Sequence, residues 1–193
     1  MSLLRTFIAI EIPQHIHKAI EDRTAGLKAA LGPSLVRWVP VENIHLTLKF
    51  LGDISPANVE LLAQMLTQEA RQQQVFEIRF EGLGVFPNPR RPRVLWIGIQ
   101  APASLEALQH GIEAAITRLG YPGEARPFSP HLTIGRVKQN VGGEGMQSIR
   151  SAVQATHIGA LGTAQVTNLA LFKSELKPTG AVYTRLLAAP LAG

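Results

Sequence analysis

Apolar and polar positions alternate in some stretches of the chain and recur with helical spacing in others, so the pattern predicts both strands and helices. An apolar run at 5–13 that ends in proline predicts a buried strand followed by a turn. From Ile16 to Leu31 the apolar residues have near-helical spacing, and Gly32 with Pro33 predicts the end of this helix. The rest of the first half predicts extended chain at 36–53, a helix from Ser55 and Pro56 to about Gln73, and a strand at 75–86.

The second half of the chain repeats this order of elements. It predicts a strand at 93–102, a helix at 104–120, a strand at 130–138, a weaker helix at 144–155, and strands at 164–174 and 181–190. The offsets between matching residues agree, because Pro102 minus Pro13 is 89 and His131 minus His45 is 86. We interpret this agreement as an internal duplication.

The duplication predicts an α+β fold. Two β-α-β-α-β units, one at about 5–86 and the other at about 93–190, would form a single bilobal domain over 1–193. We expect two antiparallel-type sheets that face a central cleft, with the helices on the outer faces. The segment "NPRRPR" marks the predicted join between the lobes, and the pattern assigns no role to the glycine-rich loop at 140–145.

Composition limits the available chemistry. The chain has 193 residues, of which 46% are hydrophobic and 17% charged, which is the balance of a packed domain. It has no cysteine, which excludes disulfides, thiolate metal sites and cysteine nucleophiles, and we expect a cytoplasmic location. The apolar run between Arg5 and Glu11 is too short for a signal peptide or a membrane span. We therefore expect no membrane segment. We also expect the protein to be a monomer.

The charge of the chain points to a polyanionic partner. The formal net charge is +5 and the pI is near 10.0, and Arg90, Arg91 and Arg93 concentrate part of this charge in "NPRRPR". A basic loop that is only solvated explains this cluster equally well. Phe86, just before the loop, is the strongest candidate for an aromatic side chain that stacks on a base.

The pattern His-x-Thr occurs twice, in "HLTLKF" and in "HLTIGR". Because successive side chains of a strand point to opposite faces, His45 shares a face with Thr47, and Lys49 is expected to follow on that face. His131 and Thr133 share a face in the same way. The apolar residues between them would face the core, so the polar pairs would face the cleft.

Two imidazoles on opposite sides of one space suit a displacement in which one proton is removed and another is delivered. Histidine can do either at neutral pH, because its ordinary pKa is near 6.5. The threonine hydroxyls can then bond the oxyanion, and Lys49 or Arg136 can add charge-assisted contacts. Phosphodiester chemistry fits this set. A single His-x-Thr is more often a structural histidine at the edge of the core, but the second copy at the matching place favours function.

Metal and nucleotide cofactors are not expected. His15 and His17 lie two residues apart on a predicted helix, which points them to different faces and argues against chelation by both. The chain has neither the Gly-x-x-x-x-Gly-Lys phosphate loop nor the Gly-x-Gly-x-x-Gly dinucleotide fingerprint.

Five segments carry a resemblance to a known family: "FIAIEIP", "RWVPVENIHLTLKFLGD", "FPNPRRPRVLWIGI", "FSPHLTIGR" and "LALFKSEL…GAVYTRL". Together they resemble the bacterial and archaeal RNA 2′,3′-cyclic phosphodiesterases, historically called 2′-5′ RNA ligases, of the two-histidine phosphoesterase superfamily. The likeness covers nearly the whole chain. It implies a bilobal fold and metal-independent hydrolysis of a 2′,3′-cyclic phosphate, on RNA ends or cyclic nucleotides, to a 2′-phosphomonoester.

The resemblance also implies a role for each motif residue. His45 would be the general acid to the leaving 3′ oxygen, and His131 would be the base that activates water. Thr47 and Thr133 fall where the family holds the phosphate, and Arg136 matches the arginine that follows its second motif.

Two alternatives remain open from the sequence. The same site could run in reverse and join a cyclic phosphate end to a 5′ hydroxyl as a 2′-5′ linkage. A nucleotide- or RNA-binding module could instead keep the cleft without useful turnover. Lys49 is the least secure of the motif residues, since it lies beyond Thr47 and would contact the RNA backbone instead of the reacting phosphate.

Overall fold

The computed structural model describes residues 2–178 and 180–193. The helices of these residues are α1 (Gln14–Leu35), α2 (Val59–Ala70), α3 (Ala103–Arg118) and α4 (Gly143–Ala155). The strands are β1 (Leu4–Glu11), β2 (Val36–Trp38), β3 (His45–Ile54), β4 (Phe76–Phe86), β5 (Val94–Gln100), β6 (His131–Val137), β7 (Ala160–Val166), β8 (Asn168–Lys177) and β9 (Gly180–Pro190). Short 3-10 helices at Val41–Asn43 and Pro56–Asn58 precede β3 and α2.

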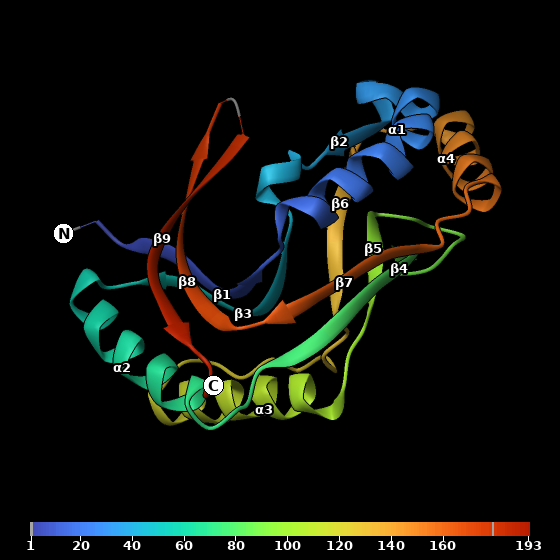
Figure 1. Ribbon diagram of the computed structural model, residues 1–193. Helices are drawn as coiled ribbons and strands as arrows, with labels where there is room; N and C mark the ends of the chain where they lie inside the picture. Colours follow the sequence, from blue (N-terminus) through green and yellow to red (C-terminus); the bar gives the residue numbers. More distant parts are fainter. Residues whose placement is uncertain (1, 179) are drawn as a thin grey trace.

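The strands form one curled antiparallel sheet in the order β7-β4-β5-β6-β3-β1-β8-β9, with β2 paired to β6 (Figure 1). The predicted α+β class with antiparallel pairing is confirmed. The two expected sheets are halves of one continuous sheet, because β3 and β6 pair with each other at Leu46 and Leu132. The midpoint of the sheet is therefore the place where the two motif strands meet.

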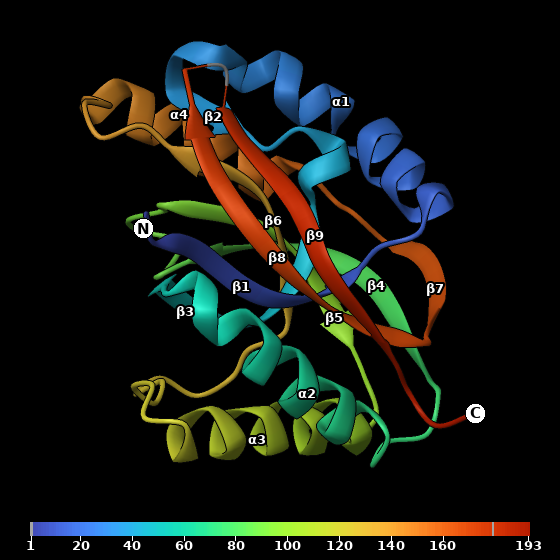
Figure 2. The ribbon, with the colours of Figure 1, turned by 90° about the vertical axis from the view of Figure 1, so that its left-hand side faces the viewer.

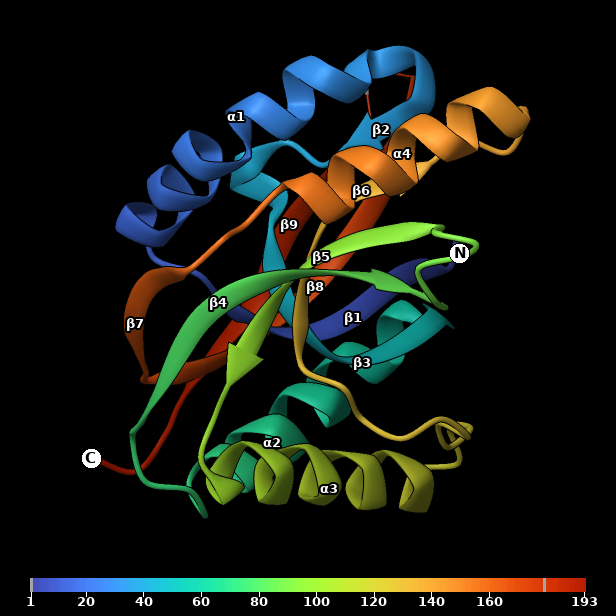
Figure 3. The ribbon, with the colours of Figure 1, turned by 90° about the vertical axis from the view of Figure 1, so that its right-hand side faces the viewer.

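The two repeats exchange strands, which the sequence pattern did not predict. β4 comes from the first repeat but lies between β5 and β7, and β8 and β9 come from the second repeat but extend the sheet beyond β1. The helices follow the same exchange: α1 packs with α4, and α2 packs with α3. Figures 2 and 3 show the first pair on one side of the molecule and the second pair on the other. Each half of the sheet thus contains elements of both repeats.

Two further details differ from the prediction. The strand expected at 164–174 is two strands, because β7 pairs with β4 in one half of the sheet and β8 pairs with β1 in the other. The first helix continues to Leu35 through a kink at Gly32, whose φ of 58° lies in the left-handed region that glycine adopts at little cost. The predicted start of the second helix is present, since the Ser55 hydroxyl accepts a hydrogen bond from the Ala57 amide at 3.3 Å.

The main core lies between the sheet and the helices. Leu46 and Leu132, the paired residues at the centre of the sheet, are both buried in it. We call the opposite face of the sheet, toward which their neighbours in β3 and β6 point, the inner face. Among the described residues, no helix is both long and apolar enough to cross a membrane.

Candidate active site

The two His-x-Thr motifs lie side by side on the inner face. When the pairing of the two central leucines is continued by one residue in each direction, His45 lies opposite Thr133 and Thr47 lies opposite His131. Residues directly opposite each other on antiparallel strands share a face. All four side chains are half-buried, whereas the leucines between them are buried. Each histidine therefore has the threonine of the other motif across from it, and the two histidines lie at diagonal corners.

His45 lies in an aromatic setting at the start of β3. Its ring stacks on Phe7 with centroids 4.7 Å apart, and the Tyr183 ring meets it edge-on at 5.3 Å. Its Nδ1 is 2.8 Å from the carbonyl oxygen of Asn43. The Asn43 side chain donates in turn to the carbonyl of Ala181 at 2.9 Å, which ties β9 to the turn before the motif.

His131 has a matching setting at the start of β6. Phe86 meets its ring edge-on with centroids 4.9 Å apart, and Trp96 lies at 6.3 Å. Its Nδ1 is 2.7 Å from the carbonyl oxygen of Ser129. In both motifs the acceptor is the carbonyl two residues before the histidine, so the duplication extends to the group that orients the ring.

These contacts fix the tautomer of each ring. A carbonyl oxygen only accepts, so Nδ1 carries the hydrogen in both rings, and Nε2 of a neutral ring is left with its lone pair. Burial lowers the pKa of His45 below its ordinary value, against the opposing effect of the Asn43 carbonyl. Burial also lowers the pKa of His131, opposed by the Ser129 carbonyl and reinforced by the positive charge of Arg136. Both rings are thus mainly neutral at pH 7.

A bulge brings Arg136 to the inner face. On a regular strand it would point away from Thr133, but the register of β5 against β6 shifts between Leu95 and Trp96, so that an extra residue of β6 is accommodated there. Beyond the bulge Arg136 is exposed and lies near enough to His131 to affect its pKa. The arginine thus joins the histidine and threonine of its own motif on one face.

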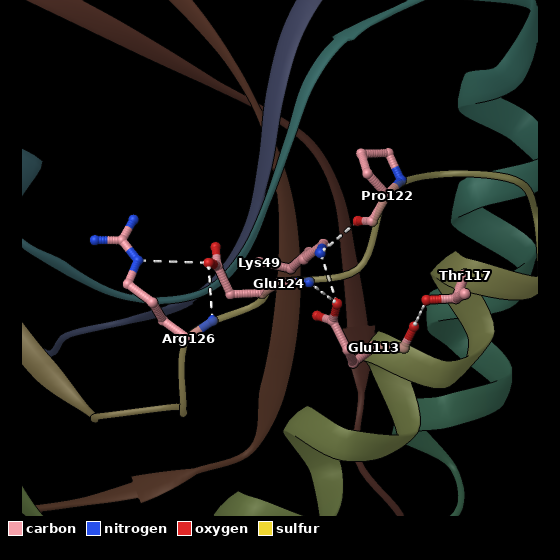
Figure 4. A network of polar contacts seen from close by, with 6 residues as sticks. All are labelled: Lys49, Glu113, Thr117, Pro122, Glu124 and Arg126. Carbon is pink, nitrogen blue, oxygen red and sulfur yellow. Dashed lines mark hydrogen bonds and ion pairs between the residues drawn. The ribbon is translucent and has the colours of Figure 1, made fainter.

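The same bulge in β3 removes Lys49 from that face, so the prediction for Lys49 was wrong. The register of β1 against β3 shifts at this place, and Lys49 is 6% exposed, next to the buried Leu48. Its Nζ donates to Glu113 Oε1 at 2.7 Å and to the carbonyl of Pro122 at 2.8 Å (Figure 4). Strict alternation fails because two successive residues of the bulged strand point to the core side.

The Lys49 network holds the chain segment that leads to the second motif. Glu113 belongs to α3, and its Oε1 also accepts from the backbone amide of Glu124 at 2.6 Å. Figure 4 shows Lys49 reaching from β3 to this carboxylate and to the loop after α3. The loop continues to Ser129, whose carbonyl orients His131. Lys49 is therefore a structural residue that ties the first motif strand to the approach to the second.

The structure places the other predicted residues in two locations. Phe86 is the last residue of β4 and contacts His131, so it forms part of the inner face and not of an exposed loop. The exposed Arg90, Arg91 and Arg93 lie in the turn between β4 and β5, on a pocket shared with Arg150 of α4.

Sequence reasoning missed Tyr183 and an ion pair. The side chain of Tyr183 in β9 lies beside His45, and burial raises the pKa of its hydroxyl, against the effect of Arg136 and then Arg5. Arg185 of the same strand pairs with Glu11 at 2.7 Å, and Glu11 lies opposite His45 across β1 and β3. Spacing in the sequence could not reveal these residues, because the order of strands in the sheet brings β9 to the first motif.

Metal binding by side chains would need a cluster of ligating groups. In residues 2–178 and 180–193, no group of three or more His, Asp and Glu side chains has a geometry that could hold a metal ion. The chemistry that the side chains of the inner face offer is proton transfer by two imidazoles, with hydroxyls and a guanidinium that can bind an anion.

Comparison with known proteins gives matches over the whole chain. The sequence model of the family described as "LigT like Phosphoesterase" matches twice, at residues 10–96 and 97–183. The RNA 2′,3′-cyclic phosphodiesterase of Methanothermobacter thermautotrophicus is 32% identical, over 94% of this chain and 95% of its own. Among solved structures, the protein TT0787 of Thermus thermophilus superposes with a TM-score of 0.80 at 29% identity, covering 98% of this chain and 99% of that one. Escherichia coli LigT complexed with 3′-AMP gives a TM-score of 0.75 at 27% identity, covering 99% of both chains.

Proposed function

The chain belongs to the LigT-like phosphoesterase family, and we propose that it is an RNA 2′,3′-cyclic phosphodiesterase, which opens a 2′,3′-cyclic phosphate to leave a 2′-phosphomonoester. The observation that carries this proposal is the pairing of β3 with β6, which sets both histidines and both threonines on one face at the centre of the sheet. In-line displacement at phosphorus needs a base and an acid on opposite sides of the reacting atom, and the diagonal arrangement supplies them.

In the proposed reaction His131 is the base. Its Nε2 takes a proton from water, and the water oxygen forms a new bond to phosphorus while the bond from phosphorus to the 3′ oxygen breaks. His45 gives its Nε2 proton to the leaving 3′ oxygen. One proton is taken up and one is delivered, so the pair returns to its starting state once the protons exchange with solvent. His131 is mainly neutral in the free protein, as a base must be. The negative phosphate favours the protonated form of His45 that an acid needs.

Thr47, Thr133 and Arg136 are proposed to hold the phosphate. Neither threonine hydroxyl has a hydrogen-bond partner among the described protein groups, unlike Thr24 and Thr67, which donate to backbone carbonyls of their own helices. Both hydroxyls are therefore available to a phosphate oxygen. Arg136 can add a charge-assisted contact as negative charge develops.

The substrate and its product test the function directly. We expect the protein to open the four nucleoside 2′,3′-cyclic phosphates and a short RNA with a cyclic end, and phosphorus NMR should identify the product as the 2′-phosphate. Turnover should survive excess EDTA, because each proton-transfer step is assigned to a side chain. A 3′-phosphate product would contradict the 3′ oxygen as leaving group. Turnover that is lost with EDTA and restored by one divalent metal would contradict the two-histidine mechanism.

The same assay distinguishes the two alternatives that the sequence leaves open. A binding module without turnover would bind the cyclic nucleotides and release no monoester. Ligation would appear as a 2′-5′ linkage when an RNA with a 5′ hydroxyl is added, and the excess of water favours hydrolysis. We further propose that the protein acts as a monomer in the cytoplasm, since one chain supplies every residue of the inner face and the chain has no cysteine.

The pH dependence follows from the lowered pKa values of both histidines. The base His131 must be neutral, so kcat/KM should fall as the pH drops through its pKa. The acid His45 must be protonated, so kcat/KM should fall as the pH rises through its pKa. Both pKa values lie below 6.5, and kcat/KM reports the free enzyme, so the maximum should lie on the acid side of pH 6.5. A maximum of kcat/KM above pH 7.5 would refute this assignment.

A further inference from the structure

A basic pocket lies at the rim of the sheet, outside the group of motif residues. Its volume is about 340 Å³, and Arg90, Arg91, Arg93 and Arg150 line it together with Gly142 and Gly143 at the start of α4. We call it the arginine pocket. No acidic side chain lines it, and none of the four arginines forms an ion pair among the residues that the structure describes. Such a concentration of uncompensated positive charge favours a phosphate group as its ligand.

Hydrogen bonds hold this turn in a defined shape. Asn88 Oδ1 accepts from the backbone amides of Arg90 and Arg91 at 3.0 and 3.1 Å, and the amide of Arg93 donates to the Phe86 carbonyl at 2.7 Å. Arg150 Nη1 donates to the carbonyl of Arg90 at 3.4 Å, which links the turn to α4. The backbone positions from which the arginine side chains extend are therefore fixed by the fold.

Two features of α4 add to the attraction for an anion. The helix begins at Gly143, which lines the pocket, so the positive end of the helix dipole lies there, and no side chain caps it. The Nε of Arg150 is buried and has no hydrogen-bond partner among the described groups, so no acceptor of the protein offsets its positive charge there. The loop at 140–145, which no sequence pattern connects to a function, forms this wall of the pocket.

The arginine pocket lies close to the second motif. The turn that carries three of its arginines starts directly after Phe86, which contacts His131. Along β5, Val94 lies opposite Arg136 and Gly98 lies opposite His131, so four residues of strand, about 13 Å, separate the pocket end from the histidine. Figure 3 shows the turn between β4 and β5 and the start of α4 at the same edge of the molecule.

Two more arginines lie near the end of the second motif strand that is closer to the pocket. Arg37 of β2 is paired directly with Arg136 of β6, and both side chains are exposed. Opposite residues share a face, so Arg37 joins Arg136 at the edge of the inner face. Arg136 and Arg37 thus add positive charge at the end of β6 that is level with Val94, the first residue of β5 after the pocket turn.

We propose that the arginine pocket binds a backbone phosphate of the RNA strand that precedes the cyclic phosphate, so that the enzyme acts on the ends of RNA chains more efficiently than on free cyclic nucleotides. This inference rests on the proposed function. A cyclic phosphate terminates the 3′ end of a strand, so the rest of the RNA must leave the inner face in the 5′ direction, and the line of arginines gives it a path.

The test compares substrates of increasing length on matched variants. Wild-type protein, the variant Arg90→Gln/Arg91→Gln/Arg93→Gln and the control Arg23→Gln/Arg71→Gln/Arg118→Gln are assayed with cyclic-ended RNAs of increasing length from the mononucleotide. The control removes the same charge from exposed positions outside the pocket. Glutamine keeps the backbone amides that shape the turn, and thermal unfolding checks that each variant folds.

We expect the KM of the wild type to fall with RNA length while kcat stays constant. The pocket variant should lose this fall and keep its activity on the mononucleotide, and the control should behave as the wild type. The slope of log affinity against log salt should decrease by about 0.7 for each phosphate that the variant no longer binds. No length effect in the wild type, equal losses in the two triple variants, or equal losses on mononucleotide and RNA would each overturn the proposal.

Binding separates this inference from the proposed function. Fluorescence anisotropy with labelled RNAs that end in a 2′-phosphate needs no turnover, so it measures the pocket even if the wild type opens no cyclic phosphate. A length-dependent affinity that only the pocket variant loses supports the arginine pocket. If ATP or inorganic phosphate binds with the same dependence on Arg90, Arg91 and Arg93 while longer RNA gains nothing, the pocket takes free phosphates and the proposal fails.

Discussion

Replacing His45 or His131 with asparagine is expected to lower kcat/KM by about 10²- to 10⁴-fold, or about 3 to 5 kcal/mol in the barrier, because each removes one proton-transfer group. Asparagine is chosen because its side-chain amide can still donate where Nδ1 does, to the carbonyls of Asn43 and Ser129. The variant thus keeps the structural contact and loses only Nε2. Steady-state kinetics on a cyclic nucleotide measure the effect.

The exposed His110 of α3 supplies the control, since it lies in the helix layer and His110→Ala should leave kcat/KM unchanged. Each histidine variant should unfold close to the wild-type temperature. If the asparagine variants retain near-wild-type turnover, the two rings are packing residues of the aromatic surroundings and the proposed chemistry fails.

A modified substrate distinguishes the acid from the base. When sulfur replaces the 3′ oxygen, the leaving group is a thiolate, which needs no proton because a thiol has a pKa near 8.5. This substrate should restore much of the rate of His45→Asn and none of the rate of His131→Asn. The opposite pattern would exchange the two roles.

The periodicity of a strand was enough to predict how each motif presents its side chains. Leucine positions alternate with His45 and Thr47 in "HLTL", and the burial of Leu46 and Leu48 leaves the polar pair on the inner face. The duplication was also visible, because the offset between the two histidines agrees with the order of elements around them. Both signals are local or repeat at a fixed distance, so a sequence can carry them.

Features that depend on neighbouring strands could not be predicted. The bulge in β3 turns Lys49 toward Glu113, and the matching bulge in β6 has Gly135 at that position, where an added Cβ would lie 2.8 Å from the Val36 side chain. Periodicity alone gives no sign of an extra residue in a strand. Tyr183 was missed for a related reason, because β9 reaches His45 only through its place in the sheet.

Only part of the arginine pocket could be predicted from the sequence. The sequence showed a charged cluster at Arg90, Arg91 and Arg93, which could be either a binding site for a polyanion or a solvated loop. Arg150 lies 57 residues beyond Arg93 in α4, in a segment with no motif, and only the fold brings that helix beside the turn. A cluster within the sequence could be identified, but the fourth arginine needed the fold.

Replacing Thr47 or Thr133 with valine should cost about 1.5 to 3 kcal/mol in transition-state binding, roughly ten- to 150-fold in kcat/KM. Valine keeps the β-branched shape and the strand preference while it deletes the hydroxyl that is proposed to bind a phosphate oxygen. Serine at the same positions should recover much of the activity, because it returns the hydroxyl. The pH profile should keep both limbs, since neither imidazole is changed.

Thr184 provides the matched control for these variants. It is an exposed threonine in β9, and it points to the opposite side of that strand from its neighbour Tyr183. Thr184→Val is therefore the same substitution, made at a position outside the inner face. Its kcat/KM should equal that of the wild type. Valine variants of Thr47 and Thr133 with full activity, or serine variants that fail where valine succeeds, would make both threonines packing residues. The contacts to the phosphate oxygens would then have to come from Arg136, whose replacement by glutamine is the next variant to measure.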